Sequence, residues 1–449
     1  MPYTTLTTGS AGFGHMPAEL NLQLLEALPD MPSLKNAVTA SGQLRRCFSA
    51  YSTTVSTRVV QNEVPKHSWT HAVVVNMLLS GKLELPDLDN TDIGNINSTI
   101  NKIRHLRDTA PKARVTPKDA LAISRFHKKI TALRDLFVAD CANAKQQQLH
   151  PLFDSIRYRP ATPSELIRIE QALYLFQILA CFCKNMTFSK LGDREYTDQS
   201  REKVSSLQKC IVERLMSPWE MYQVIGIQAY FRRAMHGFER DSTVSERIMP
   251  GLLVGGIDLM HEALCVAGHA NVANFIAPHE EQALNRPFNA MGVVVSRGTY
   301  KTWTRDGTKA IGDYAPFCPD SDKLGYASWA RLEKHQLRLV GTHQTNLDLF
   351  HDLIEALEGR LDLWGAALWD ESRWVEIEHT LRQPEPAFWV DLDMKHHWDS
   401  SEKGFGIVSR AEAVEEGFKE EEKARAEKEC ERRVVRVPQD VHPLWQVVD

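Results

Sequence analysis

The residues best suited by type and spacing to bind a metal ion lie near the C-terminal end, in the run DLDMKHHWD. Three carboxylates and two imidazoles fall within nine residues: Asp391, Asp393, His396, His397 and Asp399. Carboxylate oxygens and imidazole nitrogens are common ligands of divalent metals in proteins. A metal-dependent enzyme is therefore one hypothesis, although no second set of ligands is recognisable elsewhere. An exposed polar loop is the simpler interpretation of this run.

Motifs for other common chemistries begin in this sequence but are not completed. HEALC and HEEQA start like the zinc-binding motif H-E-x-x-H, yet Cys265 and Ala283 stand at the position of its second histidine. GFG at residues 12–14 could start a dinucleotide-binding fingerprint, but Pro17 occupies the place of the third glycine. The sequence also contains no G-x-x-x-x-G-K-[ST] and no G-x-S-x-G motif. We therefore expect no enzyme activity, no catalytic residues, no metal site and no cofactor.

The cysteines indicate a reducing compartment. Eight of them are spread through 449 residues and form no dense disulfide framework, so we expect reduced thiols in the cytoplasm or nucleus. Cys181 and Cys183 are two residues apart in an apolar helical segment, where their side chains would point about 200° away from each other. That geometry favours packing in the core over shared binding of one metal ion.

Charge and hydropathy exclude two classes of partner at the level of the whole chain. The formal net charge is −5 and the isoelectric point about 6.4, so no overall basic field favours nucleic acid or an anionic membrane. The longest apolar segment, LYLFQILACFC at 173–183, is much shorter than a bilayer span, and the first residues do not resemble a signal peptide. We therefore expect neither a nucleic acid nor a membrane as partner.

Hydrophobic periodicity predicts a mostly α fold with few or no strands. TPSELIRIEQALYLFQILACFC repeats apolar residues at helical spacing after a capping Thr162 or Ser164, and its other faces are also apolar, so we expect a central buried helix. SPWEMYQVIGIQAYFRRAMHGF begins with a capping Ser217 and with Pro218 at the first helical position. Only GVVVSRGTY is typical of a short strand.

The predicted helices and loops divide the chain into four parts. We expect a disordered tail over 1–15, a short helical unit over 16–64, a larger irregular helical body over 65–410, and a charged helix with a C-terminal tail over 411–449. Long loops are predicted near 81–94 and 301–330.

The short unit opens with the run MPAELNLQLLEALPDMPSLKNAVTASGQLRRCF at 16–48. Its first helix should start near Pro17 and place Leu20, Leu24 and Leu28 on one stripe. Leu22 and Leu25 widen the apolar arc to roughly 200°, well beyond the ~100° that packing on one core requires. LPDMPS should end this helix, with Ser33 capping the next one.

This opening run resembles an F-box, with its Met-Pro start, leucine-rich first helix, LPD-x-PSL turn and later helix ending in an aromatic residue. TPSELIRIEQALYLFQILACFC, SPWEMYQVIGIQAYF and LDLWGAALWDESRW are similar to segments of uncharacterised filamentous-fungal proteins that begin with an F-box-like unit and continue as a helical body. The resemblance implies that the short helices bind a Skp-type adaptor, which links a protein to a cullin-RING ubiquitin ligase.

Our leading hypothesis is therefore a non-catalytic F-box-like protein that acts as a substrate receptor, with an unknown protein target held by the body. The wide apolar arc is independently consistent with this role, because one side can pack internally while a partner covers the other. The residues expected to form or support the adaptor surface are Met16, Pro17, Leu20, Leu22, Leu24, Leu25, Leu28 and Leu34.

Two alternatives remain open. A helical scaffold without adaptor binding would bury these leucines inside its own chain. A metal-dependent enzyme would bring Asp391, Asp393, His396 and His397 together in a pocket, at ligand distances of about 2.0–2.2 Å.

Overall fold

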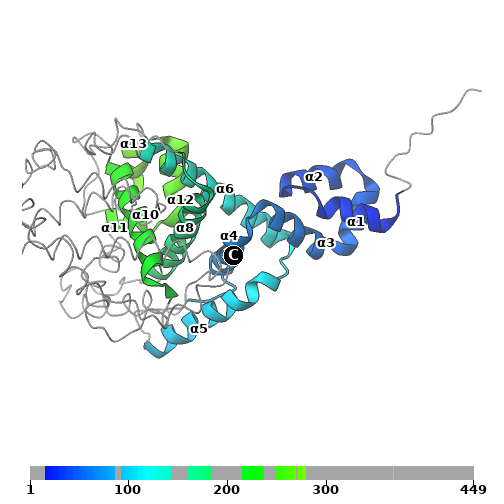
Figure 1. Ribbon diagram of the computed structural model, residues 1–449, viewed down its shortest axis with the longest axis horizontal. Coiled ribbons are helices and arrows are strands. Elements are labelled where there is room, and N and C mark those ends of the chain that lie inside the picture. The colour runs from blue at the N-terminus through cyan, green and yellow to red at the C-terminus, as the bar shows by residue number, and fades with distance from the viewer. Residues whose placement is uncertain are drawn as a thin grey trace, which may run out of the picture. The chain divides into compact units, whose positions relative to one another are not determined.

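A computed structural model describes residues 16–85, 93–142, 160–184, 215–236, 249–268, 272–279 and 368 (Figure 1). Within these ranges the chain is helical and contains no strand, which confirms the predicted mostly α class. The possible strand GVVVSRGTY, the tail 1–15, the loop 301–330 and the segment 411–449 lie outside the described residues. Most of the predicted loop 81–94 does so too.

The chain forms two compact units. The first unit consists of residues 1–84 and 102–131, and the second of residues 85–101 and 132–449. The helices that begin in residues 16–142 are α1 (Ala18–Glu26), α2 (Met31–Ala40), α3 (Gly42–Glu63), α4 (Lys66–Leu79), α5 (Ile93–Thr109) and α6 (Pro117–Ala142). Helices α3 and α4 both belong to the first unit. The boundary at residue 64 stays a prediction from the sequence.

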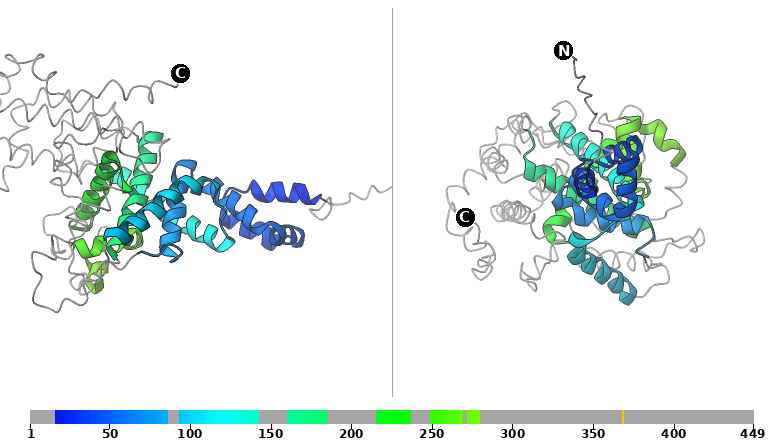
Figure 2. Two further views of the ribbon diagram at one scale, coloured as in Figure 1. Left: turned by 90° about the horizontal axis from the view of Figure 1, so that it is seen from below. Right: turned by 90° about the vertical axis from the view of Figure 1, so that its right-hand side faces the viewer.

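Helices α1 and α2 both pack on α3 (Figures 1 and 2). Pro17 precedes α1 directly, as the sequence predicts, and its missing N–H costs no hydrogen bond at a helix start. The predicted cap of the second helix was wrong. Asp30, not Ser33, is the N-cap of α2, because its carboxylate accepts a hydrogen bond from the Ser33 N–H at 2.7 Å and the helix begins two residues before Ser33.

Helix α3 consists of two helical halves that meet at a kink. Ser41 caps its start by accepting from the Leu44 N–H at 3.3 Å. Tyr51 departs from helical geometry, with φ −126° and ψ 27°, so the axis is interrupted between the two halves. Helix α4 ends just before Gly81, which adopts φ +70°, a conformation that favours glycine.

The core of the first unit contains side chains from α1, α2, α3, α4 and the start of α6. Its buried apolar side chains include Leu25, Leu34, Leu44, Val55, Val59, Val60, Trp69, Val74, Ile123 and Phe126. The Trp69 indole N–H donates to the carbonyl of Ala110 at 2.9 Å, which satisfies the one polar group of this large side chain.

The described helices of the second unit include α8 (Pro163–Lys184), α10 (Pro218–His236), α11 (Met249–Leu253), α12 (Gly256–His261) and α13 (Val272–Ile276), with a π-helical turn at Glu262–Ala267. Helix α8 packs against α10 and α12 (Figure 1). Both predicted helix starts are confirmed as capping boxes, Thr162 with Glu165 and Ser217 with Glu220, in which each pair exchanges side-chain and backbone hydrogen bonds.

Helix α8 is central and buried, as its apolar faces predict. It is long and apolar enough to cross a membrane, but 89% of its most apolar window is buried inside the protein. Its polar side chains find partners within the second unit: Glu170 pairs with Arg134, and Gln177 accepts from the Ile257 N–H at 2.7 Å. This burial, with hydrogen bonds to Glu170 and Gln177, is typical of a core helix.

Candidate interaction surface

Two amide side chains bind the residues at the start of α1: Asn21 from α1 itself and Gln43 from α3. Asn21, which is 1% exposed, donates from Nδ2 to the carbonyls of Met16 and Pro17 at 3.0 and 3.1 Å. Gln43 donates from Nε2 to the same Met16 carbonyl at 2.9 Å, across 27 residues of sequence. Residues 16–18 are therefore fixed relative to α3, and the orientation of α1 follows from this attachment.

The other end of α1 is fastened in the same way. Asn62, near the end of α3, donates from Nδ2 to the carbonyls of Glu26 and Leu28 at 2.8 and 2.9 Å. The Glu26 carbonyl is in the last turn of α1, where carbonyls lack intrahelical partners, and the Leu28 carbonyl follows two residues beyond the end of the helix. Glu63 accepts from the Met31 N–H at 3.3 Å and so binds the start of α2 to the same end of α3.

The predicted site residues divide into three groups by exposure. Leu25 and Leu34 are fully inside the unit, at 0% and 2% exposed, so they can support a surface but do not line one. Leu20 is 46% exposed, although it belongs to a helix that packs on α3. Pro17 is exposed, and the half-buried members are Met16, Leu22, Leu24 and Leu28.

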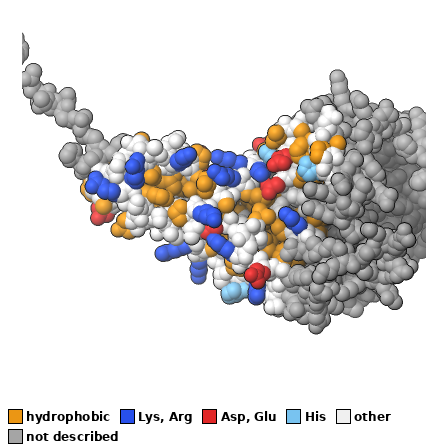
Figure 3. Space-filling view, turned by 180° about the vertical axis from the view of Figure 1, so that it is seen from behind, with side chains coloured by type: hydrophobic (Ala, Val, Ile, Leu, Met, Phe, Trp, Pro, Cys, Tyr) orange, Lys and Arg blue, Asp and Glu red, His pale blue; other side chains and the backbone are white. Residues whose placement is uncertain are grey.

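The apolar arc of α1 is thus buried at its centre and accessible along one edge. Asn21 and Leu25 lie at the centre of the arc against α3. Leu20 and Leu24 follow one another at a spacing of four residues on α1. Leu28 lies two residues beyond the end of this helix, so the predicted stripe of three leucines is helical only as far as Leu24. We call these three residues the leucine edge. Figure 3 shows apolar side chains exposed among Lys and Arg side chains on the first unit.

The residues that position this edge, Asn21, Gln43 and Asn62, are not among those predicted from the sequence. Asn21 interrupts the leucine run and is buried, although asparagine usually lies at the surface. Gln43 and Asn62 lie 27 to 36 residues away from the carbonyls that they bind. A polar residue on the apolar face of a predicted helix was the one available signal, and it pointed to Asn21 alone.

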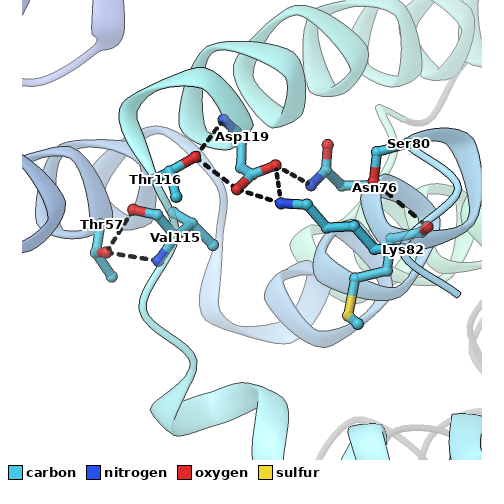
Figure 4. Close-up of polar contacts among 8 residues, drawn as sticks. Thr57, Asn76, Ser80, Lys82, Val115, Thr116 and Asp119 are labelled. Carbon is cyan, nitrogen blue, oxygen red and sulfur yellow. Dashed lines mark hydrogen bonds and ion pairs between the residues drawn. The ribbon is translucent and has the colours of Figure 1, made fainter.

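A polar cluster around Asp119 fastens α6 to α4 within the same unit (Figure 4). The carboxylate accepts from Lys82 Nζ at 2.6 Å on both oxygens, from the Thr116 hydroxyl at 2.6 Å and from Asn76 Nδ2 at 3.3 Å. Burial alone would raise the pKa of Asp119, but these hydrogen bonds and the positive charge of Lys82 outweigh it and lower the pKa to about 2. The carboxylate therefore stays ionised over the physiological range.

A second polar contact fastens α3 to the residues that lead into α6. The Thr57 hydroxyl accepts from the Val115 N–H at 2.9 Å and lies 3.3 Å from the carbonyl of the same residue. The Ser124 hydroxyl donates to Glu63 at 2.8 Å. These contacts hold the second half of α3 to the start of α6, and Figure 4 shows the one between Thr57 and Val115.

The cysteine pair of α8 behaves as core, as the sequence indicates. Cys181 and Cys183 are both buried and free of disulfides. Gln177 Nε2 lies 3.3 Å from the Cys181 sulfur, and burial raises the pKa of the Cys183 thiol to about 12. A neutral thiol in apolar surroundings is a poor metal ligand and a poor nucleophile.

The described part of the chain contains no group of three or more His, Cys, Asp or Glu side chains that could hold a metal ion. The candidate ligands Asp391, Asp393, His396, His397 and Asp399 lie outside the described residues, so the metal hypothesis remains a prediction from the sequence. The leucine edge is therefore the predicted site that the structure describes in most detail.

Comparison with known proteins adds no identification. No family model, curated protein or solved structure matches this chain. What the chain does must be argued from its own residues.

Proposed function

We propose that this protein is a non-catalytic F-box-like interaction protein whose leucine edge binds a Skp-type adaptor of a cullin-RING ubiquitin ligase. The observation that carries the proposal is the 46% exposure of Leu20 on a helix whose two ends are both hydrogen-bonded to α3. An apolar edge on a rigidly held helix suits burial by a partner helix, because little ordering cost is added on binding.

The role of such a protein is proximity. The adaptor would connect it to the ligase, while its remaining helices hold a target protein. Tethering raises the effective concentration of the target's lysines near the ligase without any chemistry by this chain. Its substrate receptor function therefore requires two surfaces, of which the leucine edge is one.

A scaffold without adaptor binding is the second candidate, and a specific observation favours it. Leu25 and Leu34, two of the eight predicted surface residues, are packed inside the first unit. If the remaining leucines served only internal packing as well, charge at Leu20 would affect stability alone. The two candidates therefore differ in what a substitution at the edge does to binding.

The test is co-expression of the full chain with a Skp-type adaptor, followed by affinity purification and a measured dissociation constant. Leu20→Asp should weaken adaptor binding at least tenfold, because a carboxylate would be desolvated at the contact. Leu79→Asp is the matched control, since Leu79 is 48% exposed on α4 of the same unit. It should leave the affinity unchanged.

Circular dichroism and thermal unfolding of both variants show whether either has lost its fold. Adaptor binding by the parent chain that Leu20→Asp abolishes and Leu79→Asp retains would support the proposal. A folded parent chain that does not bind the adaptor, or equal loss in both variants, would support the scaffold candidate instead.

A further inference from the structure

The charge of this protein is divided unevenly between its two units. Residues 1–84 and 102–131 contain 15 Lys and Arg against 7 Asp and Glu, a net charge of +8 with neutral histidines. The whole chain carries −5, so the remaining residues carry −13. The average charge that led us to expect no nucleic-acid partner therefore conceals a strongly basic unit.

The positive charge is densest around the start of α6. Residues 110–131 hold six basic residues and a single acidic one, Asp119, which is 8% exposed and paired with Lys82. The exposed basic side chains in this segment, which we call the basic strip, are Lys112, Arg114, Lys118, Arg125 and Lys128. No exposed negative charge within residues 110–131 offsets them.

The helix itself aligns most of the strip. Lys118, Arg125 and Lys128 are separated by seven and three residues, a spacing that places them on one side of α6. At 1.5 Å per residue this row is about 15 Å long. Lys112 and Arg114 extend it beyond the N-terminal end of α6, where the helix dipole adds partial positive charge.

Helix α3 contributes to the same region. Thr57 and Val115 are hydrogen-bonded to each other. Arg58 follows Thr57 in the sequence and Arg114 precedes Val115, so both arginines flank this contact. Arg58 is exposed, as is Arg114. Lys128 has two carboxylates nearby: Glu63 at 3.7 Å, which the Ser124 hydroxyl also contacts, and Asp30, whose pKa is lowered mainly by its hydrogen bonds with Ser33 and further by the charge of Lys128. The other four members of the strip form no ion pair within the described residues.

We propose that the basic strip binds the phosphate backbone of a nucleic acid. An extended row of Lys and Arg without a pocket matches a repeated negative charge better than a single small anion. A membrane surface is less suitable, because peripheral binding also needs a contiguous apolar face to insert. The exposed large apolar side chains of the first unit, Leu20, Tyr51, Leu79 and Leu121, are distributed over four helices.

This inference is independent of the adaptor proposal, since the strip and the leucine edge share no residue. It predicts binding that depends on salt and little on base sequence. Each phosphate contact on duplex DNA contributes about 0.9 to the slope of log affinity against log salt concentration. Loss of two contacts should therefore lower that slope by roughly 1.8.

The test is fluorescence anisotropy of the full chain with a labelled DNA duplex of about 20 base pairs and an RNA strand of equal length, over a range of salt concentrations. The double variant Lys118→Gln, Arg125→Gln should weaken binding about tenfold and reduce the salt slope. The matched control is Lys35→Gln, Arg46→Gln, which removes one lysine and one arginine that are exposed on α2 and α3 of the same unit. Circular dichroism should show both variants folded.

Binding that the strip variant weakens and the control variant retains would support the proposal. No binding to either nucleic acid at low salt would overturn it. Equal loss in both variants would also overturn it, because binding would then reflect the total charge of the unit. Binding to phosphatidylserine vesicles without binding to either nucleic acid would assign the strip to a membrane instead and overturn the inference.

Discussion

The pKa of the buried Asp119 carboxylate is set by the side chains that contact it. Its pKa of about 2 lies below the value of about 3.9 expected for an unfolded chain, because Lys82, Thr116 and Asn76 stabilise the charged form. The depressed pKa means that the native state binds this proton less readily than the unfolded state. Stability from this group is therefore present above pH 4 and is lost as the pH falls toward 2.

We expect Asp119→Asn to lower the free energy of unfolding at pH 7 by about 1–2 kcal/mol, after allowing for the solvent exposure of Lys82. The deficit should shrink as the pH falls from 4 toward 2, since the parent chain loses the same interaction there. Urea denaturation at several pH values measures both quantities. Glu19→Gln, at an exposed position of α1, is the control and should change stability by less than about 0.5 kcal/mol. A deficit that does not vary with pH would contradict the assignment of the low pKa.

The exposure of single residues could be predicted only in part from the sequence. The leucines of α1 could be recognised from their spacing, but the pattern could not tell which would be covered by the rest of the chain. Leu25 became core and Leu20 remained accessible because α3 contacts the centre of the arc. The burial of Asn21 depends on the Met16 carbonyl, whose position no local pattern reveals.

At the scale of elements, helix starts were the most predictable features. Caps were predicted at Thr162 or Ser164 and at Ser217, and the structure shows Thr162 and Ser217 as caps, each in a box with a Glu three residues later. The start of α2 was misassigned because both Asp30 and Ser33 are good capping residues and Pro32 suits either choice. Only the hydrogen bond between the two residues decides that Asp30 is the cap.

This assignment makes a prediction about α2. The hydrogen bond from Ser33 lowers the pKa of Asp30, as expected for a carboxylate that caps a helix. Asp30→Ala should cost about 1 kcal/mol of unfolding free energy, whereas Asp30→Ser should restore most of it because a hydroxyl can also accept from the Ser33 N–H. Thermal or urea unfolding compares the two variants. Equal losses in both would show that Asp30 stabilises the unit in some other way.

The kink in α3 is another element-scale feature with consequences for the site. Tyr51 separates a first half that carries Gln43 from a second half that carries Asn62. Both side chains bind α1, so the two halves together fix one helix. The second half is rich in β-branched residues, which have low helix propensity, and packing of Val55, Val59 and Val60 in the core explains why it is helical.

At the scale of the molecule, the division into two units carries information that the chain average concealed. The overall mostly α class could be predicted, because apolar periodicity is a local property of each segment. The assignment of residues 102–131 to the unit of residues 1–84 could not, since it depends on contacts between segments far apart in sequence. The net charge of +8 becomes visible only after this assignment.

The two proposals place two partners on one small basic unit. The leucine edge of α1 would be covered by the adaptor, while the basic strip of α6 would remain available to nucleic acid. If both are right, the protein could bring a ligase to targets that are bound to nucleic acid. Loss of one interaction by substitution should leave the other unchanged, because the two surfaces use different residues.

The measurement that tests the central claim most directly is site-specific photo-crosslinking of the full chain to a Skp-type adaptor. A photoreactive residue replaces Leu20 in one preparation and Leu79 in another, so that both probes occupy half-exposed positions of the same unit. We predict a crosslink to the adaptor from position 20 and none from position 79. No adaptor crosslink from position 20, or equal crosslinking from both positions, would contradict docking at the leucine edge.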